Sequence, residues 1–170
     1  MSSQIGLNIA VLTVSDSRTV ENDTSGSWLL EAVEKSQHQV IDRGLVADDK
    51  YAIRACLSSW IYDQNIDVII STGGTGLTGR DGTPEAALPL LDKVIDGFAE
   101  YFRYLSVAEI KTSTLQSRCF AGVANGTIIF CLPGSTNACQ LAWNEIIEPQ
   151  LNSNTKPCNL VDLIPRFLEK

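Results

Sequence analysis

Residues 67–86, DVIISTGGTGLTGRDGTPEA, join a short apolar run to a loop with four glycines in seven residues. The run 67–71 is rich in β-branched side chains and predicts a buried strand. Glycine allows positive φ and close approach of backbone N–H groups to a ligand, so the loop resembles an anion cradle. Thr83, Pro84 and Glu85 then give a helix start, with a capping hydroxyl, an early proline and an acid in the first turn. The alternative is a tight turn that only lets strand and helix pack, since neither the Walker pattern nor G-x-G-x-x-G is present.

The chain before this loop alternates between strand and helix patterns. Residues 5–14 form a nearly continuous apolar and β-branched run, and residues 40–46 (VIDRGLV) are predicted to be a second strand. Residues 28–36 and 51–63 carry apolar side chains at helical spacing. This alternation predicts right-handed βαβ units in an α/β fold with a mostly parallel sheet. His38 lies in the polar segment between helix and strand and is predicted to be a solvated turn residue.

The second half of the chain predicts two more helices and a hairpin. A helix is expected over about 96–105, with Phe98 and Phe102 in the core or in a subunit contact. Asn125 and Gly126 separate two apolar runs and predict a β-hairpin with a two-residue turn. A last helix is expected to end before Pro149.

Length and composition limit the classes of function. With 170 residues we expect a single domain, with a core over about 5–157 and a tail over 158–170. The 13 Lys and Arg against 20 Asp and Glu give a net charge of −7, which argues against nucleic acid and membrane partners. A single His excludes catalysis by a histidine pair and a multi-histidine zinc site within one chain. No signal peptide or membrane-spanning run is recognised, and five scattered cysteines without a CxxC pair predict reduced thiols in a cytoplasmic protein.

Three strand-to-helix junctions carry small and hydroxyl residues: 15–18, 71–83 and 133–136. The carboxyl ends of parallel strands share one sheet edge, so these junctions are expected to surround a crevice that takes a phosphate-rich ligand. Taken singly, such a junction is more often ordinary helix capping than a binding site, and it is the occurrence of three together that favours a ligand. The candidate binding residues are Ser15, Asp16, Thr72, Gly73, Gly74, Thr75, Gly76, Ser117, Arg118, Pro133, Gly134 and Ser135.

Two acidic residues are candidates for metal binding and catalysis. Asp48 follows the second predicted strand and Asp81 follows the glycine loop, so their carboxylates could share a Mg²⁺ bound to a polyphosphate. Asp48 can equally be a turn or cap residue. Arg118 can pair with a phosphate or form a surface ion pair.

These segments together resemble the molybdenum-cofactor biosynthesis family that includes MoaB and the molybdopterin adenylyltransferases. The resemblance covers about 9–157 and looks closer to the MoaB branch. It rests on an ordered set of motifs: TVSDSR from 13, DTSG from 23, STGGTGLTGRDGTPEA from 71, a GF-x-E-x-F-R-x-LS run over 97–106, TSTLQSR from 112 and LPGST from 132.

The resemblance implies a three-layer α/β/α sandwich and a homotrimer or hexamer built as a dimer of trimers. It implies transfer of AMP from Mg²⁺-ATP to the phosphate of molybdopterin, with release of pyrophosphate, and other proteins of the same biosynthetic route as partners. By similarity, Asp48 and Asp81 are the two functionally important aspartates, and the loop 73–76 binds phosphates. Ala47 and Leu77 depart from the adenylyltransferase pattern. A non-catalytic binding paralogue, a weak nucleotide hydrolase and a scaffold domain therefore remain alternatives.

Overall fold

The buried strand β1 (Asn8–Val14) lies inside a six-stranded sheet of order β2-β1-β3-β6-β5-β4. This computed structural model describes residues 4–170. β2 (Gln39–Val46), β1, β3 (Val68–Thr72) and β6 (Thr127–Leu132) run parallel to one another, whereas β5 (Phe120–Ala124) is antiparallel to β6. The predicted α/β class with a mostly parallel sheet is confirmed.

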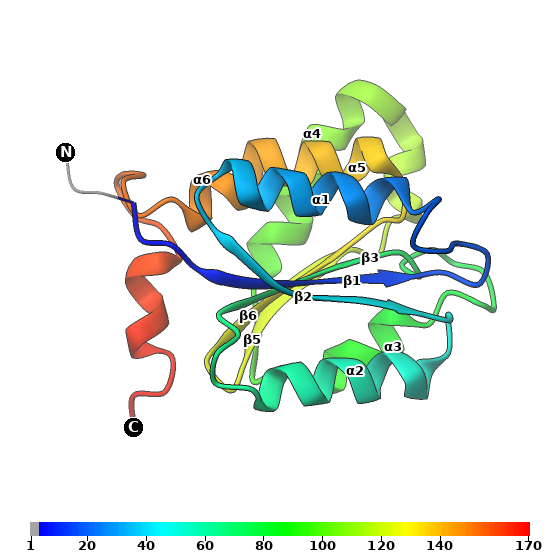
Figure 1. Ribbon diagram of the computed structural model, residues 1–170. Helices are drawn as coiled ribbons and strands as arrows, with labels where there is room; N and C mark the ends of the chain where they lie inside the picture. The colour runs from blue at the N-terminus through cyan, green and yellow to red at the C-terminus, as the bar shows by residue number, and fades with distance from the viewer. Residues whose placement is uncertain (1–3) are drawn as a thin grey trace.

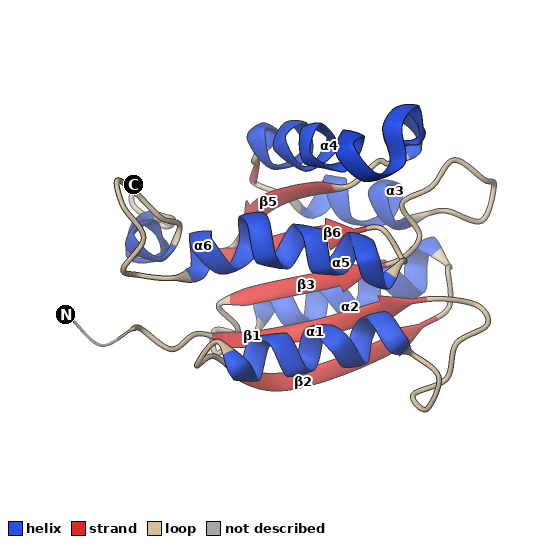
Figure 2. Ribbon diagram, turned by 90° about the horizontal axis from the view of Figure 1, so that it is seen from above, coloured by secondary structure: helices blue, strands red, loops and turns tan. Residues whose placement is uncertain are grey.

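Helices cover both faces of the sheet and complete the three layers (Figures 1 and 2). Alternate side chains of β1 explain this, because Ile9 and Val11 join one core cluster while Leu12 and Val14 join the other. The first face is covered by α1 (Thr24–Lys35), α4 (Asp96–Ile110), α5 (Thr136–Ala142) and α6 (Glu148–Leu151). The second is covered by α2 (Lys50–Tyr62) and the short α3 (Thr83–Ala87).

The predicted hairpin joins β5 to β6. Asn125 has φ 49° and Gly126 has φ 85°, which is the pair of positive values that a two-residue turn of this kind requires. The two-residue strand β4 (Lys93–Val94) pairs antiparallel with β5 at the edge of the sheet and was not predicted, because so short a strand leaves no periodic pattern.

Several element boundaries differ from the sequence prediction. The first strand begins at Asn8 rather than at residue 5, and α4 continues five residues beyond the expected end to Ile110. The last helix does not end before Pro149, because π-type turns at Trp143–Ile147 lead directly into α6. The π-type turn is wider than an α-helical turn and changes which backbone groups pair. It does so just before Pro149, which has no amide hydrogen to donate, so the helix can continue past this residue.

Short 3₁₀ segments occupy Leu88–Leu90, Lys111–Gln116 and Val161–Arg166. The last of these belongs to the tail, where Leu160, Ile164 and Phe167 pack against the core on the α1 face. All five cysteines are free, as expected. None of the helices within residues 4–170 is both long enough and apolar enough to cross a membrane.

The prediction for His38 was wrong, because its side chain is buried. Its Nδ1 accepts a hydrogen bond of 3.2 Å from the backbone N–H of Leu7, the residue that leads into β1. Burial lowers the pKa of His38, and the carboxylate of Glu148 partly opposes this effect. The turn is polar in sequence, but the N-terminal segment folds over it.

Candidate functional site

The loops that follow β1, β2 and β3 are tied together at the carboxyl edge of the sheet. The backbone N–H of Asp48 donates to Oδ1 of Asp16 at 3.1 Å, and the N–H of Gly82 donates to Oδ1 of Asp48 at 3.0 Å. Arg80 forms an ion pair with Asp16. Since the chain reverses its winding direction between β1 and β3, this edge is where open α/β sheets bind ligands.

Two glycines of the loop after β3 have conformations that a side chain would not tolerate. Gly73 has φ 103°, and a Cβ there would lie 2.1 Å from the carbonyl oxygen of Val14. Gly74 has φ 67°, and a Cβ there would lie 2.4 Å from the hydroxyl oxygen of Thr83 and 2.9 Å from a carboxylate oxygen of Asp48. The glycines thus bring the backbone of this loop against β1 and against the Asp48 carboxylate.

Thr83 is not the cap of α3 as predicted. Gly82 occupies the cap position, and the Thr83 hydroxyl donates to the carbonyl of Gly73 at 2.8 Å. The N–H of Thr83 also donates to the carbonyl of Gly74 at 3.0 Å. The loop folds back on its own start, so the hydroxyl holds the glycine turn closed instead of capping a helix.

A first hollow, which we call the aspartate cleft, contains both predicted aspartates. One part has a volume of about 300 Å³ and the adjoining part about 480 Å³, and the carboxylate-bearing residues Asp48 and Asp81 line both. Arg80 and Arg118 line the second part. Predicted binding residues lining the first part are Ser15, Asp16, Thr72, Gly73, Gly74 and Gly134.

The two aspartates experience opposite environments. Burial raises the pKa of Asp48; the carboxylates of Asp81 and Asp16 add to this rise, while the hydrogen bond from Gly82 opposes it. The pKa of Asp81 is lowered, chiefly by the Thr78 hydroxyl, which donates to Oδ2 at 2.7 Å. The two carboxylates that line the cleft thus differ in their surroundings, although they lie on neighbouring loops.

The donor set of the aspartate cleft fits a magnesium ion that is held mainly by substrate. Within residues 4–170 there is no group of three or more His, Cys, Asp or Glu able to hold a metal by themselves. Mg²⁺ is commonly held by one or two carboxylates together with substrate phosphates. Asp48 and Asp81 provide two carboxylates. Burial is the main cause of the raised pKa of Asp48, and the repulsion from Asp81 and Asp16 that adds to it would be relieved by a cation.

Arg118 is engaged in holding the glycine loop in place. Its guanidinium donates to the carbonyls of Gly76 at 2.7 Å and of Asp81 at 3.0 Å, and it forms an ion pair with Glu85. The backbone N–H of Arg118 donates to the carbonyl of Thr75 at 3.0 Å. These contacts agree with the ion-pair alternative and make Arg118 a residue that positions the loop.

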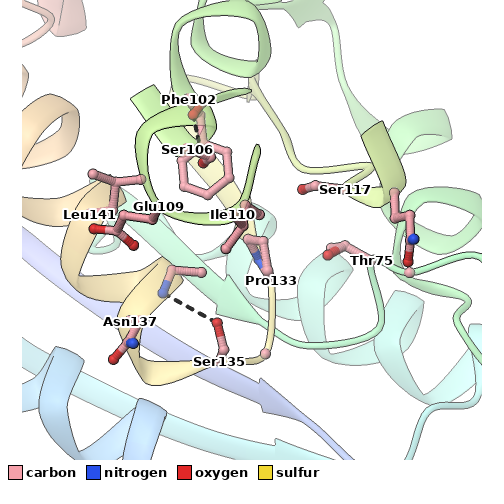
Figure 3. Close-up of a pocket in the computed structure, with 14 residues that line it drawn as sticks. Thr75, Phe102, Ser106, Glu109, Ile110, Ser117, Pro133, Ser135, Asn137 and Leu141 are labelled. Atoms are coloured by element: carbon pink, nitrogen blue, oxygen red, sulfur yellow. Dashed lines mark hydrogen bonds between the residues drawn. The ribbon is translucent and has the colours of Figure 1, made fainter. Parts of the chain in front are cut away.

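A second hollow, the helix cavity, lies between α4 and α5 and has a volume of about 410 Å³ (Figure 3). The predicted residues Thr75, Gly76, Ser117, Pro133, Gly134 and Ser135 line it. Gly134 also lines the aspartate cleft, and a Cβ there would lie 3.4 Å from Cα of Gly73. The single crevice expected from the sequence is thus two adjoining hollows that meet at Gly134.

Sequence reasoning missed the walls of the helix cavity. They come from helices that are far apart in the chain: Phe102, Ser106, Glu109 and Ile110 from α4, and Asn137, Ala138 and Leu141 from α5. A signal for α4 was present, because positions 98, 102, 106 and 109 continue one helical face. Because the helix was predicted to end at residue 105, the last two of these positions were not recognised as part of that face.

Comparison with known proteins places the chain in a family. Residues 10–153 match the family described as "Probable molybdopterin binding domain". The chain therefore belongs to this molybdopterin-binding family. It is 54% identical over 155 residues to molybdenum cofactor biosynthesis protein B of Escherichia coli (strain K12), covering 91% of each protein. It is 47% identical over 149 residues to the protein of that name from Staphylococcus carnosus, covering 86% of this chain and 87% of the relative.

Solved structures of the same family share the fold. A crystal structure of molybdenum cofactor biosynthesis protein B superposes with a TM-score of 0.85 at 38% identity, covering 88% of this chain and 94% of the other. The tungsten cofactor synthesizing protein MoaB from Pyrococcus furiosus gives a TM-score of 0.78 at 34% identity, covering 86% and 92% respectively. The resemblance identified from the motifs is confirmed, and family membership supports a role in molybdenum-cofactor biosynthesis.

Proposed function

We propose that the protein transfers AMP from Mg²⁺-ATP to the terminal phosphate of molybdopterin, giving adenylyl-molybdopterin and pyrophosphate. The observation that carries this proposal is the meeting of the two hollows at Gly134. One hollow has mainly apolar walls suited to a ring system, and the other has two carboxylates beside a glycine loop suited to phosphates. Two substrates held on either side of Gly134 would have their phosphates close together.

This reaction depends on positioning the two substrates more than on proton transfer. A phosphate oxygen of molybdopterin attacks the α-phosphorus of ATP, and the bond between that phosphorus and the α–β bridging oxygen breaks as pyrophosphate leaves. The attacking oxygen is already ionised near neutral pH, so no general base is needed, which fits a chain whose only His is buried away from the site. Orientation and local charge stabilisation then provide the rate enhancement.

Individual residues have separate tasks in this proposal. Gly73 and Gly74 bring backbone groups close to the phosphates, and Arg118 and Thr83 hold that loop in shape. Asp48 and Asp81 would hold Mg²⁺, which when bound to ATP neutralises charge on the phosphates. Ser15 and Asp16 border the same cleft, where Asp16 also anchors the backbone of Asp48.

The test is a product assay. The protein is incubated anaerobically with molybdopterin, Mg²⁺ and ATP, and adenylated product and pyrophosphate are measured; GTP in place of ATP reports nucleotide preference. We expect product with ATP and none without Mg²⁺. Saturable binding of molybdopterin with no product would overturn the enzyme proposal and favour a binding-only paralogue. Free AMP or ADP without adenylated pterin would instead identify a nucleotide hydrolase.

The proposal extends to assembly and location. We propose a homotrimer or a dimer of trimers, supported by exposed apolar side chains on α4 that include Tyr101, Tyr104 and Val107. We also propose contact with other proteins of molybdenum-cofactor biosynthesis, which would pass the pterin on. The cytoplasmic location that we propose is supported by the five free cysteines.

A further inference from the structure

The helix cavity has the form of a slot for a flat ring. Its volume of about 410 Å³ lies in the range of ordinary small-molecule sites. Phe102, Ile110, Ala138 and Leu141 provide apolar walls, and the hydroxyl of Ser106 is used within α4, where it donates to the carbonyl of Phe102 at 2.8 Å. Apolar walls suit the two faces of a flat ring. The few free polar groups of the cavity are then left to form hydrogen bonds with the atoms at the edge of the ring.

Glu109 is the free charged group of this cavity. Within residues 4–170 its carboxylate takes part in no hydrogen bond or ion pair, and its side chain is exposed. In the view of Figure 3 Glu109 and Leu141 lie at one end of the cavity, whereas Thr75 and Ser117 lie at the other. A carboxylate without a partner at the end of an apolar slot is an acceptor for two adjacent N–H donors.

We infer that the helix cavity takes the pterin ring of the substrate and that Glu109 determines its specificity by accepting hydrogen bonds from the 2-amino group and the adjacent ring N–H. This inference rests on the proposed function and assigns the ring of the same substrate to a subsite. A ligand lying from Glu109 toward Gly134 has its ring between α4 and α5, and its phosphate reaches the glycine loop. The nucleotide phosphates then occupy the aspartate cleft, on the other side of Gly134.

The hydrogen-bonding groups at the edge of the ring distinguish a pterin from related ring systems. A pterin presents two neighbouring donors to a carboxylate, whereas a lumazine has a carbonyl oxygen in place of the 2-amino group and would face the carboxylate with an acceptor. A site built around a hydrogen bond rejects a ligand that cannot make it, because a polar group is left unpaired. The variant Glu109→Gln keeps the size of the side chain and can donate as well as accept, so it should tolerate both edges.

The experiment compares 6-hydroxymethylpterin with 6-hydroxymethyllumazine by equilibrium titration of ligand fluorescence. We expect the wild-type protein to prefer the pterin by about 10-fold or more. Glu109→Gln should weaken pterin binding and reduce the preference to less than about 3-fold. Glu100→Gln is the matched control, because Glu100 is also exposed on α4 but does not line the cavity. That variant should retain the wild-type preference.

The outcomes separate this inference from the proposed reaction. No preference in the wild-type protein, no binding of either ligand, or an unchanged preference in Glu109→Gln overturns the role of Glu109. If the wild-type protein forms adenylated product while Glu109→Gln keeps its preference, the role of Glu109 is wrong and the reaction stands. If the preference disappears in Glu109→Gln but no adenylated product forms with wild-type protein, the subsite stands and the reaction is wrong.

Discussion

A substitution at Gly73 tests whether the conformation of the glycine loop requires a residue without a side chain. Its φ is 103°, and a Cβ at this position would lie 2.1 Å from the Val14 carbonyl oxygen, which leaves no room for alanine. We expect Gly73→Ala to lower the free energy of unfolding by about 3 kcal/mol, combining backbone strain and a steric clash. Gly79→Ala is the control, since a Cβ there meets nothing within 4 Å. Urea unfolding that gave the two variants the same stability would contradict the argument.

Asp81 allows a metal-binding role to be separated from a role in loop structure. Its carboxylate accepts two hydrogen bonds from Thr78, one from the backbone N–H at 2.8 Å and one from the hydroxyl at 2.7 Å. We expect Asp81→Asn to lower the rate of AMP transfer by roughly 100-fold, the scale of losing one electrostatic contact in a transition state. Molybdopterin affinity should change little, because the pterin lies in the other hollow.

Thr78→Val is the matched variant for this test. It removes the hydroxyl hydrogen bond to Asp81 but keeps the carboxylate. We expect its rate to stay within about 5-fold of wild type. Equal losses in Asp81→Asn and Thr78→Val, measured as single-turnover rates, would assign Asp81 to loop structure alone.

For single residues, the sequence predicts the position well where that position follows from the neighbouring segments of the chain. Asp48 comes two residues after the end of β2, and Asp81 comes at the end of the glycine loop that begins after β3, so their place at the carboxyl edge of the sheet could be inferred from the order of the chain alone. His38 and Glu109 could not be placed in this way. The burial of His38 depends on Leu7, 31 residues earlier, and the position of Glu109 at the cavity depends on how α4 packs against α5.

The turn between α1 and β2 gives a prediction about elements, because His38 fastens it to the segment that enters β1. Nδ1 must be unprotonated to accept from Leu7, and burial holds the pKa of His38 in the folded protein below the value of about 6.5 that an exposed histidine has. The unfolded chain therefore binds more protons as the pH falls below about 6.5, and the free energy of unfolding must decrease over that range. Above it, this contribution to stability is fully present.

His38→Asn should remove this dependence, because its side-chain oxygen can accept the same hydrogen bond but does not titrate. His38 is the single histidine of the chain, so no other imidazole contributes between about pH 7.5 and 5.5. Urea unfolding at both pH values should show a larger loss for wild type than for His38→Asn. Equal losses in the two proteins would show that other groups cause the acid sensitivity.

Elements were predicted best where local chemistry decides them. The hairpin at Asn125 and Gly126 was predicted because positive φ at two consecutive positions requires such residues. The end of α4 was misplaced because residues 106–110, of which only Ser106 is buried, keep helical geometry without a strong apolar pattern. Pro149 misled for a similar reason, since proline normally interrupts a helix but the preceding π-type turns accommodate it.

For the whole molecule, the net charge of −7 opposes the binding of both substrates that we propose, ATP and molybdopterin. The long-range field of an acidic protein repels a triphosphate and a phosphorylated pterin alike. Attraction must then be local. The phosphates would be held by backbone N–H groups of the loop at Gly73 and Gly74 and by a cation between Asp48 and Asp81. The ring would be held by hydrogen bonds to the donors at its edge. Because surface charges are screened over about 10 Å at 0.1 M salt, these short-range contacts are the ones that remain effective.

The same net charge affects assembly, because copies that each carry −7 repel one another. We therefore expect stable association to depend mainly on the burial of apolar surface. Such a surface exists on α4 and the segment after it, which we call the α4 strip. It consists of the exposed side chains Tyr101, Tyr104, Val107, Ile110 and Leu115. Ile110 also lines the helix cavity, so a second copy seated on the strip would lie beside the pterin subsite.

Light scattering should therefore give a mass of three or six chains for wild type and a smaller assembly for Tyr104→Lys. Tyr62→Lys is the control, because Tyr62 lies on the opposite face of the sheet at 84% exposure against 73% for Tyr104. We expect Tyr62→Lys to keep the wild-type mass. A monomeric wild type, or an unchanged mass in Tyr104→Lys, would contradict assembly through the α4 strip. If assembly also completes the cavity wall at Ile110, Tyr104→Lys should bind 6-hydroxymethylpterin more weakly while retaining its preference over the lumazine, since Glu109 is untouched.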